Sequence, residues 1–113
     1  ALPRLFARQP RMALEVRPIP SELAPSAAAA YYTQGSVEAG TAGVFYFNAH
    51  DLASRSTWTM ETLYLHEAEP GHHFQGALAA EDTTLPKLLR FDGNSAYWEG
   101  WALYAETLGG ELG

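Results

Sequence analysis

A proline-glycine pair interrupts the longest helical pattern in this 113-residue chain. The pattern starts at Ser56 or Thr57, which are candidate N-caps, and carries apolar residues at helical spacing. Pro70 removes a backbone donor, and Gly71 relaxes the limits on the backbone dihedral angles. We therefore expect a helix that kinks or ends at this pair, and a second helix that resumes in the segment HHFQGALAAE.

Two shorter stretches have the pattern of strands. Apolar and polar residues alternate in RMALEVRPIP, and Pro18 and Pro20 end that stretch because neither can donate a ladder hydrogen bond. The aromatic run from Val44 to Asn48 is also typical of a strand. Residues 21–43 are rich in Ala, Ser, Gly and Pro, and we expect them to be mostly irregular.

The clearest helix is NSAYWEGWALYAETLG, with Asn94 or Ser95 as its cap and Gly109 as its stop. Residues 83–89 read as a loop or short turn. These elements predict an α+β fold, in which a small sheet of two or more strands lies beside the histidine-bearing helix and a second helix. We expect one domain over residues 1–113, with an N-terminal strand and irregular segment in 1–42 and the functional core in 43–113.

The composition excludes several classes of function. The net charge of −6 argues against a nucleic-acid partner, which requires a basic surface. No apolar run approaches the roughly 20 residues needed to span a bilayer. The chain has no cysteine, so any metal must be bound by imidazole and carboxylate groups. The same absence is compatible with both cytoplasmic and exported proteins.

The helix break separates three histidines, with His66 before it and His72 and His73 after it. On an unbroken helix, a residue seven positions on would lie about 10.5 Å along the axis from His66. Two Zn–N bonds of about 2.0–2.1 Å cannot bridge that distance. If the break bulges outward, His72 falls near the position of a ligand one turn on; if the helix simply bends, His73 serves instead. We favour His72.

Two carboxylates complete the pattern of a catalytic metal site. Glu67 follows His66, so it can accept a proton from a metal-bound water as a general base. Glu99 is the expected third ligand, and the adjacent Gly100 leaves room for another helix to approach. Two histidines and one glutamate leave an open position, as in catalytic zinc sites. Nitrogen and oxygen ligands also accept manganese, cobalt or iron.

Other residues near these motifs have two interpretations. Glu106 lies on the same helix face as Glu99, where it either orients an imidazole or is a surface charge. Tyr97 and Tyr104 are more simply packing residues than donors to an oxyanion. The tryptophans at positions 58, 98 and 101 are most simply core residues. The edge of the aromatic strand is a candidate for pairing with an extended substrate.

The two motifs LHEAEPGHHFQ and AYWEGWALYAETLGGELG together resemble the bacterial family called domain of unknown function 885. The resemblance covers roughly residues 43–113, and members of this family resemble thermolysin-like, glutamate-zincin zinc metallopeptidases. It implies a mainly helical metallopeptidase-like fold with a small sheet beside the active-site helix. It also implies that His66 and Glu67 take the ligand and base positions, and Glu99 the position of the downstream carboxylate.

The sequence therefore predicts a zinc-dependent hydrolase of peptidase type with one zinc ion and a peptide-like substrate, or its catalytic-core fragment. Members of the family are several hundred residues long, and no packing element follows the last helix, so we expect a fragment. The alternative is a non-catalytic metal-binding or structural fragment of a larger protein. Exposed core of such a fragment would favour homo-oligomers.

Overall fold

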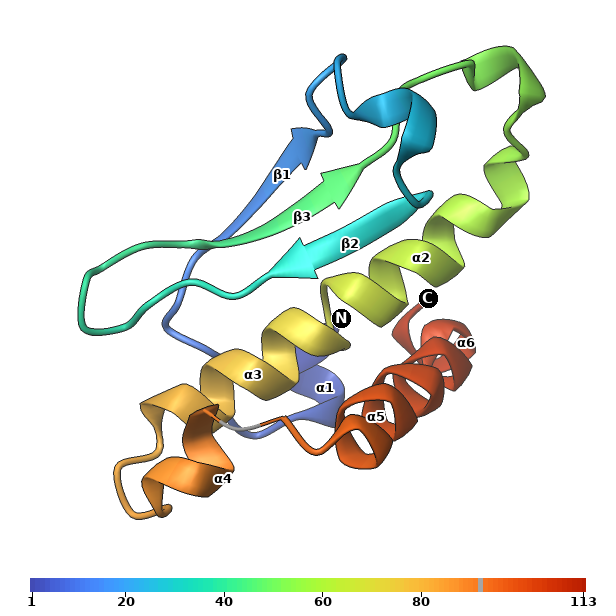
Figure 1. The fold of residues 1–113 in the computed structure, drawn as a ribbon. Coiled ribbons are helices and arrows are strands. Elements are labelled where there is room, and N and C mark those ends of the chain that lie inside the picture. Colours follow the sequence, from blue (N-terminus) through green and yellow to red (C-terminus); the bar gives the residue numbers. More distant parts are fainter. Residues whose placement is uncertain (92) are drawn as a thin grey trace.

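The computed structural model describes residues 1–91 and 93–113 and packs a small sheet against a group of helices (Figure 1). The strands are β1 (Leu14–Pro18), β2 (Ala30–Thr33) and β3 (Gly43–Phe47). The longer helices are α2 (Met60–Glu67), α3 (His72–Glu81) and α5 (Ser95–Thr107), and the short ones are α1 (Leu2–Leu5), α4 (Lys87–Phe91) and α6 (Gly109–Leu112). The predicted α+β fold with a small sheet is confirmed.

The sheet has the order β1-β3-β2, so β3 is its central strand. β1 runs parallel to β3, with Leu14 opposite Gly43, and β2 runs antiparallel to β3. Pro18 ends β1 and has no backbone N–H to donate, which is tolerated because β1 is an edge strand. Both predicted strands are present.

Residues 21–43 are mostly irregular, as predicted, but they also contain a third strand, β2, that the sequence did not predict. The composition of AAAAYY does not decide between helix and strand, and tertiary pairing with β3 settles the matter. The pairing also corrects the assignment of the sheet edge. The edge strand in contact with α2 is β2, and the aromatic strand β3 is enclosed between its two neighbours.

The helix break lies where the sequence predicts it, because α2 ends at Glu67 and α3 begins at His72. A Cβ atom at Gly71 would overlap the carbonyl oxygens of Leu65 and His66, so the chain can turn this tightly only with glycine at that position. The start of α2 differs from the prediction. A 3₁₀ turn over Thr57–Thr59 precedes the helix, and neither expected cap residue makes a side-chain capping bond.

Asn94 caps α5 as predicted, since its side-chain oxygen accepts a hydrogen bond from the backbone N–H of Tyr97 at 3.2 Å. The predicted stop at Gly109 is wrong in detail, because α5 ends at Thr107 and Gly109 begins the short helix α6. The predicted loop at residues 83–89 is partly helical, since its end lies in α4.

Small residues let the three longer helices approach one another closely. Ala68, Ala77, Ala102 and Ala105 are fully buried. The large aromatic residues contribute less to the core than the sequence predicts. Trp58, predicted as core, is 80% exposed because it lies in the turn before α2. Tyr97 and Tyr104, predicted to pack, are exposed on α5, and Trp98 and Trp101 are half-buried.

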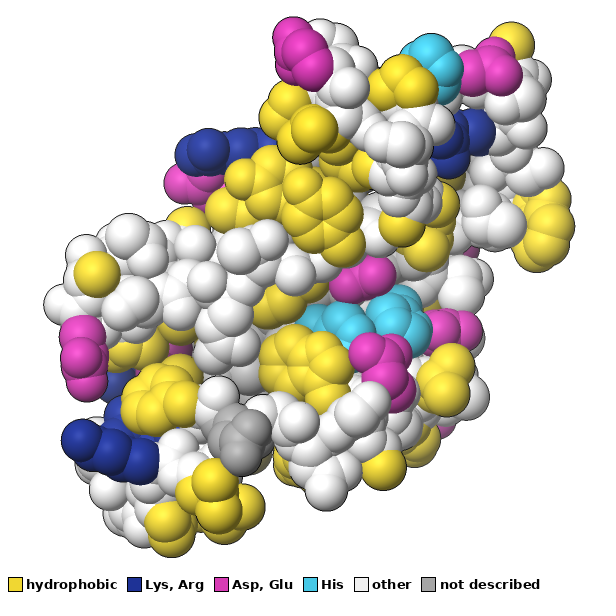
Figure 2. Space-filling view, viewed as in Figure 1, with side chains coloured by type: hydrophobic (Ala, Val, Ile, Leu, Met, Phe, Trp, Pro, Cys, Tyr) yellow, Lys and Arg dark blue, Asp and Glu magenta, His cyan; other side chains and the backbone are white. Residues whose placement is uncertain are grey.

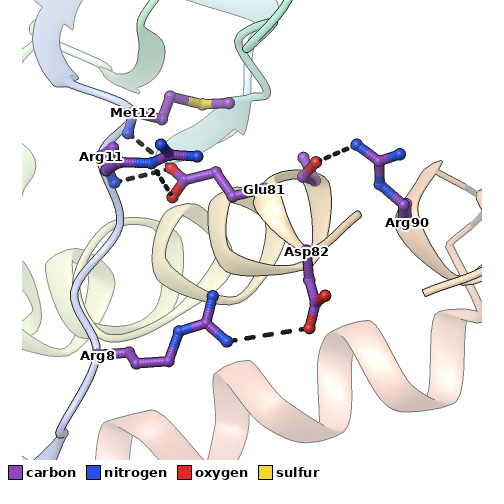
Figure 3. A network of polar contacts seen from close by, with 7 residues as sticks. Arg8, Arg11, Met12, Glu81, Asp82 and Arg90 are labelled. Carbon is purple, nitrogen blue, oxygen red and sulfur yellow. Dashed lines mark hydrogen bonds and ion pairs between the residues drawn. The ribbon is translucent and has the colours of Figure 1, made fainter. Parts of the chain in front are cut away.

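A polar network joins the N-terminal segment to the end of α3 (Figure 3). The Glu81 carboxylate accepts hydrogen bonds from the backbone N–H groups of Arg11 at 2.8 Å and Met12 at 2.9 Å, and from Arg11 Nε at 3.2 Å. Arg90 donates to the carbonyl of Ala80 at 2.6 Å on the other side of the helix end. None of the described helices combines the length and apolar character that crossing a bilayer requires.

Candidate metal centre

Two imidazoles and one carboxylate meet where α2, α3 and α5 come together. Nε2 of His66 lies 3.4 Å from one oxygen of Glu99, and Nε2 of His72 lies 3.7 Å from the other. One ligand-type atom from each residue lies within 4.8 Å of the other two. The structure thus brings together the three residues that the sequence nominated as metal ligands. His72 is buried, while the Glu99 side chain is 52% exposed.

The helix break produces this convergence. Pro70 and Gly71 turn the chain between the two helices, so that residues six positions apart bring their rings to a centroid distance of 4.8 Å. The indole N–H of Trp101 donates a 2.7 Å hydrogen bond to the carbonyl oxygen of Pro70. This bond joins the break to α5, two residues from Glu99 on the same helix.

Glu106 holds the ring of His66 from the other side. Nδ1 of His66 donates to the Glu106 carboxylate at 2.7 Å, because a carboxylate oxygen can only accept. The other ring nitrogen, Nε2, is the one that faces Glu99. Of the two interpretations of Glu106 from the sequence, the structure supports the one in which it orients an imidazole.

His72 has an apolar wall. Its ring stacks on the indole of Trp98, with a centroid distance of 4.5 Å and an interplanar angle of 6°. Burial, together with the nearby His66, lowers the pKa of His72 to about 4, against an opposing effect of Glu99. His72 is therefore neutral at pH 7. Among the described residues, its buried Nδ1 has no hydrogen-bond partner.

His73 points to a different part of the molecule. Its Nδ1 lies 3.0 Å from the hydroxyl of Tyr32 on β2, and its ring is fully buried. Burial lowers the pKa of His73, and burial raises the pKa of Tyr32 to about 12. A Cβ atom at Gly43 would overlap the Tyr32 hydroxyl and crowd His73, so glycine at that position makes room for the pair. The structure thus separates His73 from the cluster that holds His72.

Glu67 lies beside the cluster of His66, His72 and Glu99 without belonging to it. Partial burial raises the pKa of its carboxyl group, and the negative charge of Glu99 raises it further. His66 and the backbone of Tyr32 oppose this shift. The carboxylate is therefore within electrostatic reach of two members of the cluster and adjacent to the edge strand β2.

Sequence reasoning missed two side chains that shape the site. Tyr32 lies in a segment for which the composition predicts irregular structure, and Trp98, predicted as a core residue, is instead the wall of His72. A Cβ atom at Gly100, where the sequence predicts close approach of a helix, would meet no other heavy atom within 4 Å, whereas Gly43 and Gly71 are crowded. Figure 2 shows a patch of cyan histidine surface near the middle of this face, with acidic and large hydrophobic side chains beside it.

The sequence profile of the family described as "Bacterial protein of unknown function (DUF885)" matches residues 1–113. The chain belongs to the DUF885 family. The match covers the whole chain, and so includes residues 1–42, for which the two motifs gave no indication.

A solved structure resembles this DUF885 chain closely. It is titled "The crystal structure of the putative lipoprotein from Colwellia psychrerythraea", and it is 37% identical with a TM-score of 0.92. The alignment covers 99% of this chain and 19% of that chain. This chain therefore spans about one fifth of the length of that relative. Among curated proteins, none matches this chain.

Proposed function

We propose that this DUF885 chain carries the metal centre of a zinc-dependent hydrolase of peptidase type. The observation that carries the proposal is the meeting of His66 Nε2, His72 Nε2 and the Glu99 carboxylate. Two atoms that each lie about 2.0–2.1 Å from a tetrahedral ion are separated by about 3.4 Å. The nitrogen–oxygen distances of 3.4 and 3.7 Å are close to this value.

The donor set fits a divalent cation. Nε2 of His66 lies 3.4 Å from a Glu99 oxygen, and with a cation bound both atoms would direct a lone pair at the ion. Glu106 supports the outer nitrogen of His66, as carboxylates commonly do for metal-bound histidines. The half-exposed side chain of Glu99 keeps one side of the cluster open to solvent, as a catalytic site requires.

When bound, zinc supplies a Lewis acid that polarises a carbonyl group and lowers the pKa of a water molecule. Glu67 accepts the proton of the attacking water and passes it to the leaving amine nitrogen. The partial burial of Glu67 and its position next to the cluster suit this role. Among the described residues, β2 is paired on one side only, and its other edge, near α2, offers backbone groups to an extended peptide.

The test uses the full-length protein that contains this chain, purified and loaded with zinc. We expect His66→Ala to lose zinc, and Glu67→Gln to keep zinc but lose hydrolysis of a mixed peptide library. His50→Ala is the matched control, because His50 is exposed in the turn after β3 and is not in the cluster. Unchanged zinc content in His66→Ala would show that His66 is not a zinc ligand and would contradict the proposed site. Zinc binding without any hydrolysis would favour the alternative of a non-catalytic metal-binding domain.

A further inference from the structure

A cavity of about 450 Å³ lies next to the candidate metal centre. It is partly open to solvent and is lined by the residues that follow β2, one face of α3, the end of α4 and the start of α5. Trp98 belongs to both places, since its ring stacks on His72 and also lines the cavity. A ligand in this cavity would therefore touch the side chain that holds one member of the cluster.

Three polar side chains that line the cavity each donate a hydrogen bond to a backbone carbonyl. Gln34 donates to the carbonyl of Gly76 at 3.0 Å, and Gln75 donates to the carbonyl of Tyr97 at 3.4 Å. Arg90 donates to a backbone carbonyl of α3, as described above. Among the described residues, the buried Nε of Arg90 and Oε1 of Gln75 have no hydrogen-bond partner, so the polar part of the lining is only partly paired within the protein.

The rest of the lining combines polar residues at the start of α5, namely Asn94, Ser95 and Tyr97, with apolar side chains. Leu89 and Phe91 on α4 line it with about 60% of their surface exposed, and Ala79 and Trp98 line the opposite helices. A concave site with apolar walls, next to a small number of positioned polar groups, is the usual form of a ligand pocket. Its volume falls within the range of about 300–1,000 Å³ that such pockets have, so a whole aromatic or branched side chain would fit.

The chain that forms the edge strand β2 runs from the neighbourhood of Glu67 to the cavity. The backbone of Tyr32 lies near Glu67, and Gln34, two residues further along the chain, lines the cavity. Two residues of a strand span about 7 Å. A peptide extended along β2 would thus carry a side chain into the cavity one or two residues away from the bond next to Glu67.

We propose that this cavity is a specificity site that receives a large apolar side chain of the peptide substrate. The proposal rests on the hydrolase function proposed above, which it deepens by naming the substrate class. It makes Leu89 and Ala79 determinants of specificity, while the metal ligands and Glu67 determine the rate for every substrate.

The experiment compares fluorogenic peptides that carry Phe, Leu or Gly at one position, scanned across the three residues on each side of the bond that is cleaved. It uses the zinc-loaded full-length protein. We expect one position at which Phe and Leu raise kcat/KM over Gly. We expect Leu89→Ala to reduce this preference by roughly tenfold, as expected for the loss of several apolar groups from a pocket. Leu88→Ala is the matched control, because Leu88 is equally exposed on the same helix and does not line the cavity.

A second variant fills the cavity. Ala79→Leu should lower kcat/KM for the Phe peptide and leave the Gly peptide unaffected, while Ala96→Leu, at an exposed position of α5 outside the cavity, should affect neither. Equal preferences in Leu89→Ala, Leu88→Ala and the natural protein would overturn the specificity site, although the protein would still be a hydrolase.

If the natural full-length protein cleaves none of the peptides, the proposed hydrolase function fails, and binding then tests the cavity separately. N-acetyl-phenylalaninamide and N-acetyl-glycinamide are titrated into the protein and followed by nuclear magnetic resonance. Tighter binding of the phenylalanine compound, weakened by Leu89→Ala and unchanged by Leu88→Ala, would support an apolar side-chain site. Absence of binding, as expected if another part of the full-length protein fills the cavity, would overturn it.

Discussion

Trp101 and Pro70 lie 31 positions apart in the sequence, and the indole N–H of the first donates a 2.7 Å hydrogen bond to the carbonyl oxygen of the second. This bond joins the break between α2 and α3 to the helix that carries Glu99. Pro70 is buried, so its carbonyl oxygen would lose its partner without gaining full access to water if the indole were removed.

We therefore expect Trp101→Phe to weaken zinc binding as well as folding. The unsatisfied carbonyl should lower the free energy of unfolding by roughly 1–3 kcal/mol. Zinc affinity should fall because α5 no longer holds Glu99 against the two histidines. Urea denaturation and zinc titration measure the two effects. Trp58→Phe is the control, since Trp58 is 80% exposed. Equal zinc affinity in both variants would show that the bond does not position Glu99.

Two glycines close to the cluster should respond to alanine with opposite signs. At Gly71 a Cβ atom would overlap the carbonyl oxygens at the end of α2, so Gly71→Ala must open the break and separate His66 from His72. We expect a protein that is strongly destabilised and binds zinc poorly. At Gly100, inside α5, a Cβ atom would meet no other heavy atom within 4 Å. Gly100→Ala should therefore raise the free energy of unfolding by about 0.8–1.0 kcal/mol, the difference in helix propensity.

Thermal denaturation with and without zinc measures both variants. A stable Gly71→Ala protein with normal zinc binding would show that the break tolerates a side chain, which would contradict the tight turn seen in the structure. A destabilised Gly100→Ala protein would show that a part of the protein outside residues 1–113 packs against that position.

These glycines also show how far the sequence could predict the site. Proline and glycine act through local backbone rules, so the break and the second helix at His72 were predictable from residues 70 and 71 alone. Tyr32 and Trp98 were not, because their roles come from contacts made across the fold. Tyr32 reaches His73 from a strand that forms only by pairing with β3, and the AAAAYY segment has no strong preference of its own.

The aromatic residues of the helices were misjudged for a related reason. Composition says that a tryptophan is usually buried, but the amount of core available to bury it depends on the packing partners. α5 packs through Ala102 and Ala105, which leaves Tyr97 and Tyr104 exposed.

Removal of the Glu106 carboxylate should reduce zinc affinity without removing a ligand. Glu106 accepts the 2.7 Å hydrogen bond from Nδ1 of His66 and so fixes the ring and its proton. We expect Glu106→Ala to weaken zinc binding by about 10–100-fold, and Glu106→Gln to recover part of the loss because its amide oxygen can still accept. Isothermal titration with zinc measures the affinities. Glu111→Ala, at an exposed position of α6, is the control. If the alanine and glutamine variants bind zinc as tightly as the control, His66 is oriented by other contacts.

The link between Glu81 and the N-terminal segment predicts a dependence of stability on pH. Desolvation by burial raises the pKa of the Glu81 carboxyl group. The backbone N–H groups of Met12 and Arg11 and the Arg11 guanidinium lower this pKa by a larger amount, so its net value lies below the ordinary 4.5. A group with a depressed pKa in the folded state stabilises the protein fully above the pKa of the unfolded chain, and this stabilisation is lost as the pH falls through the folded pKa. We expect the free energy of unfolding to decrease below about pH 4.5.

Glu81→Gln should lower the free energy of unfolding by roughly 1–3 kcal/mol near neutral pH. It should also flatten the decrease of stability at acid pH, because glutamine does not titrate. Urea denaturation across the acid range, with Glu61→Gln at an exposed position of α2 as the control, measures both effects. A decrease equally steep in Glu81→Gln and the control would assign it to other carboxylates.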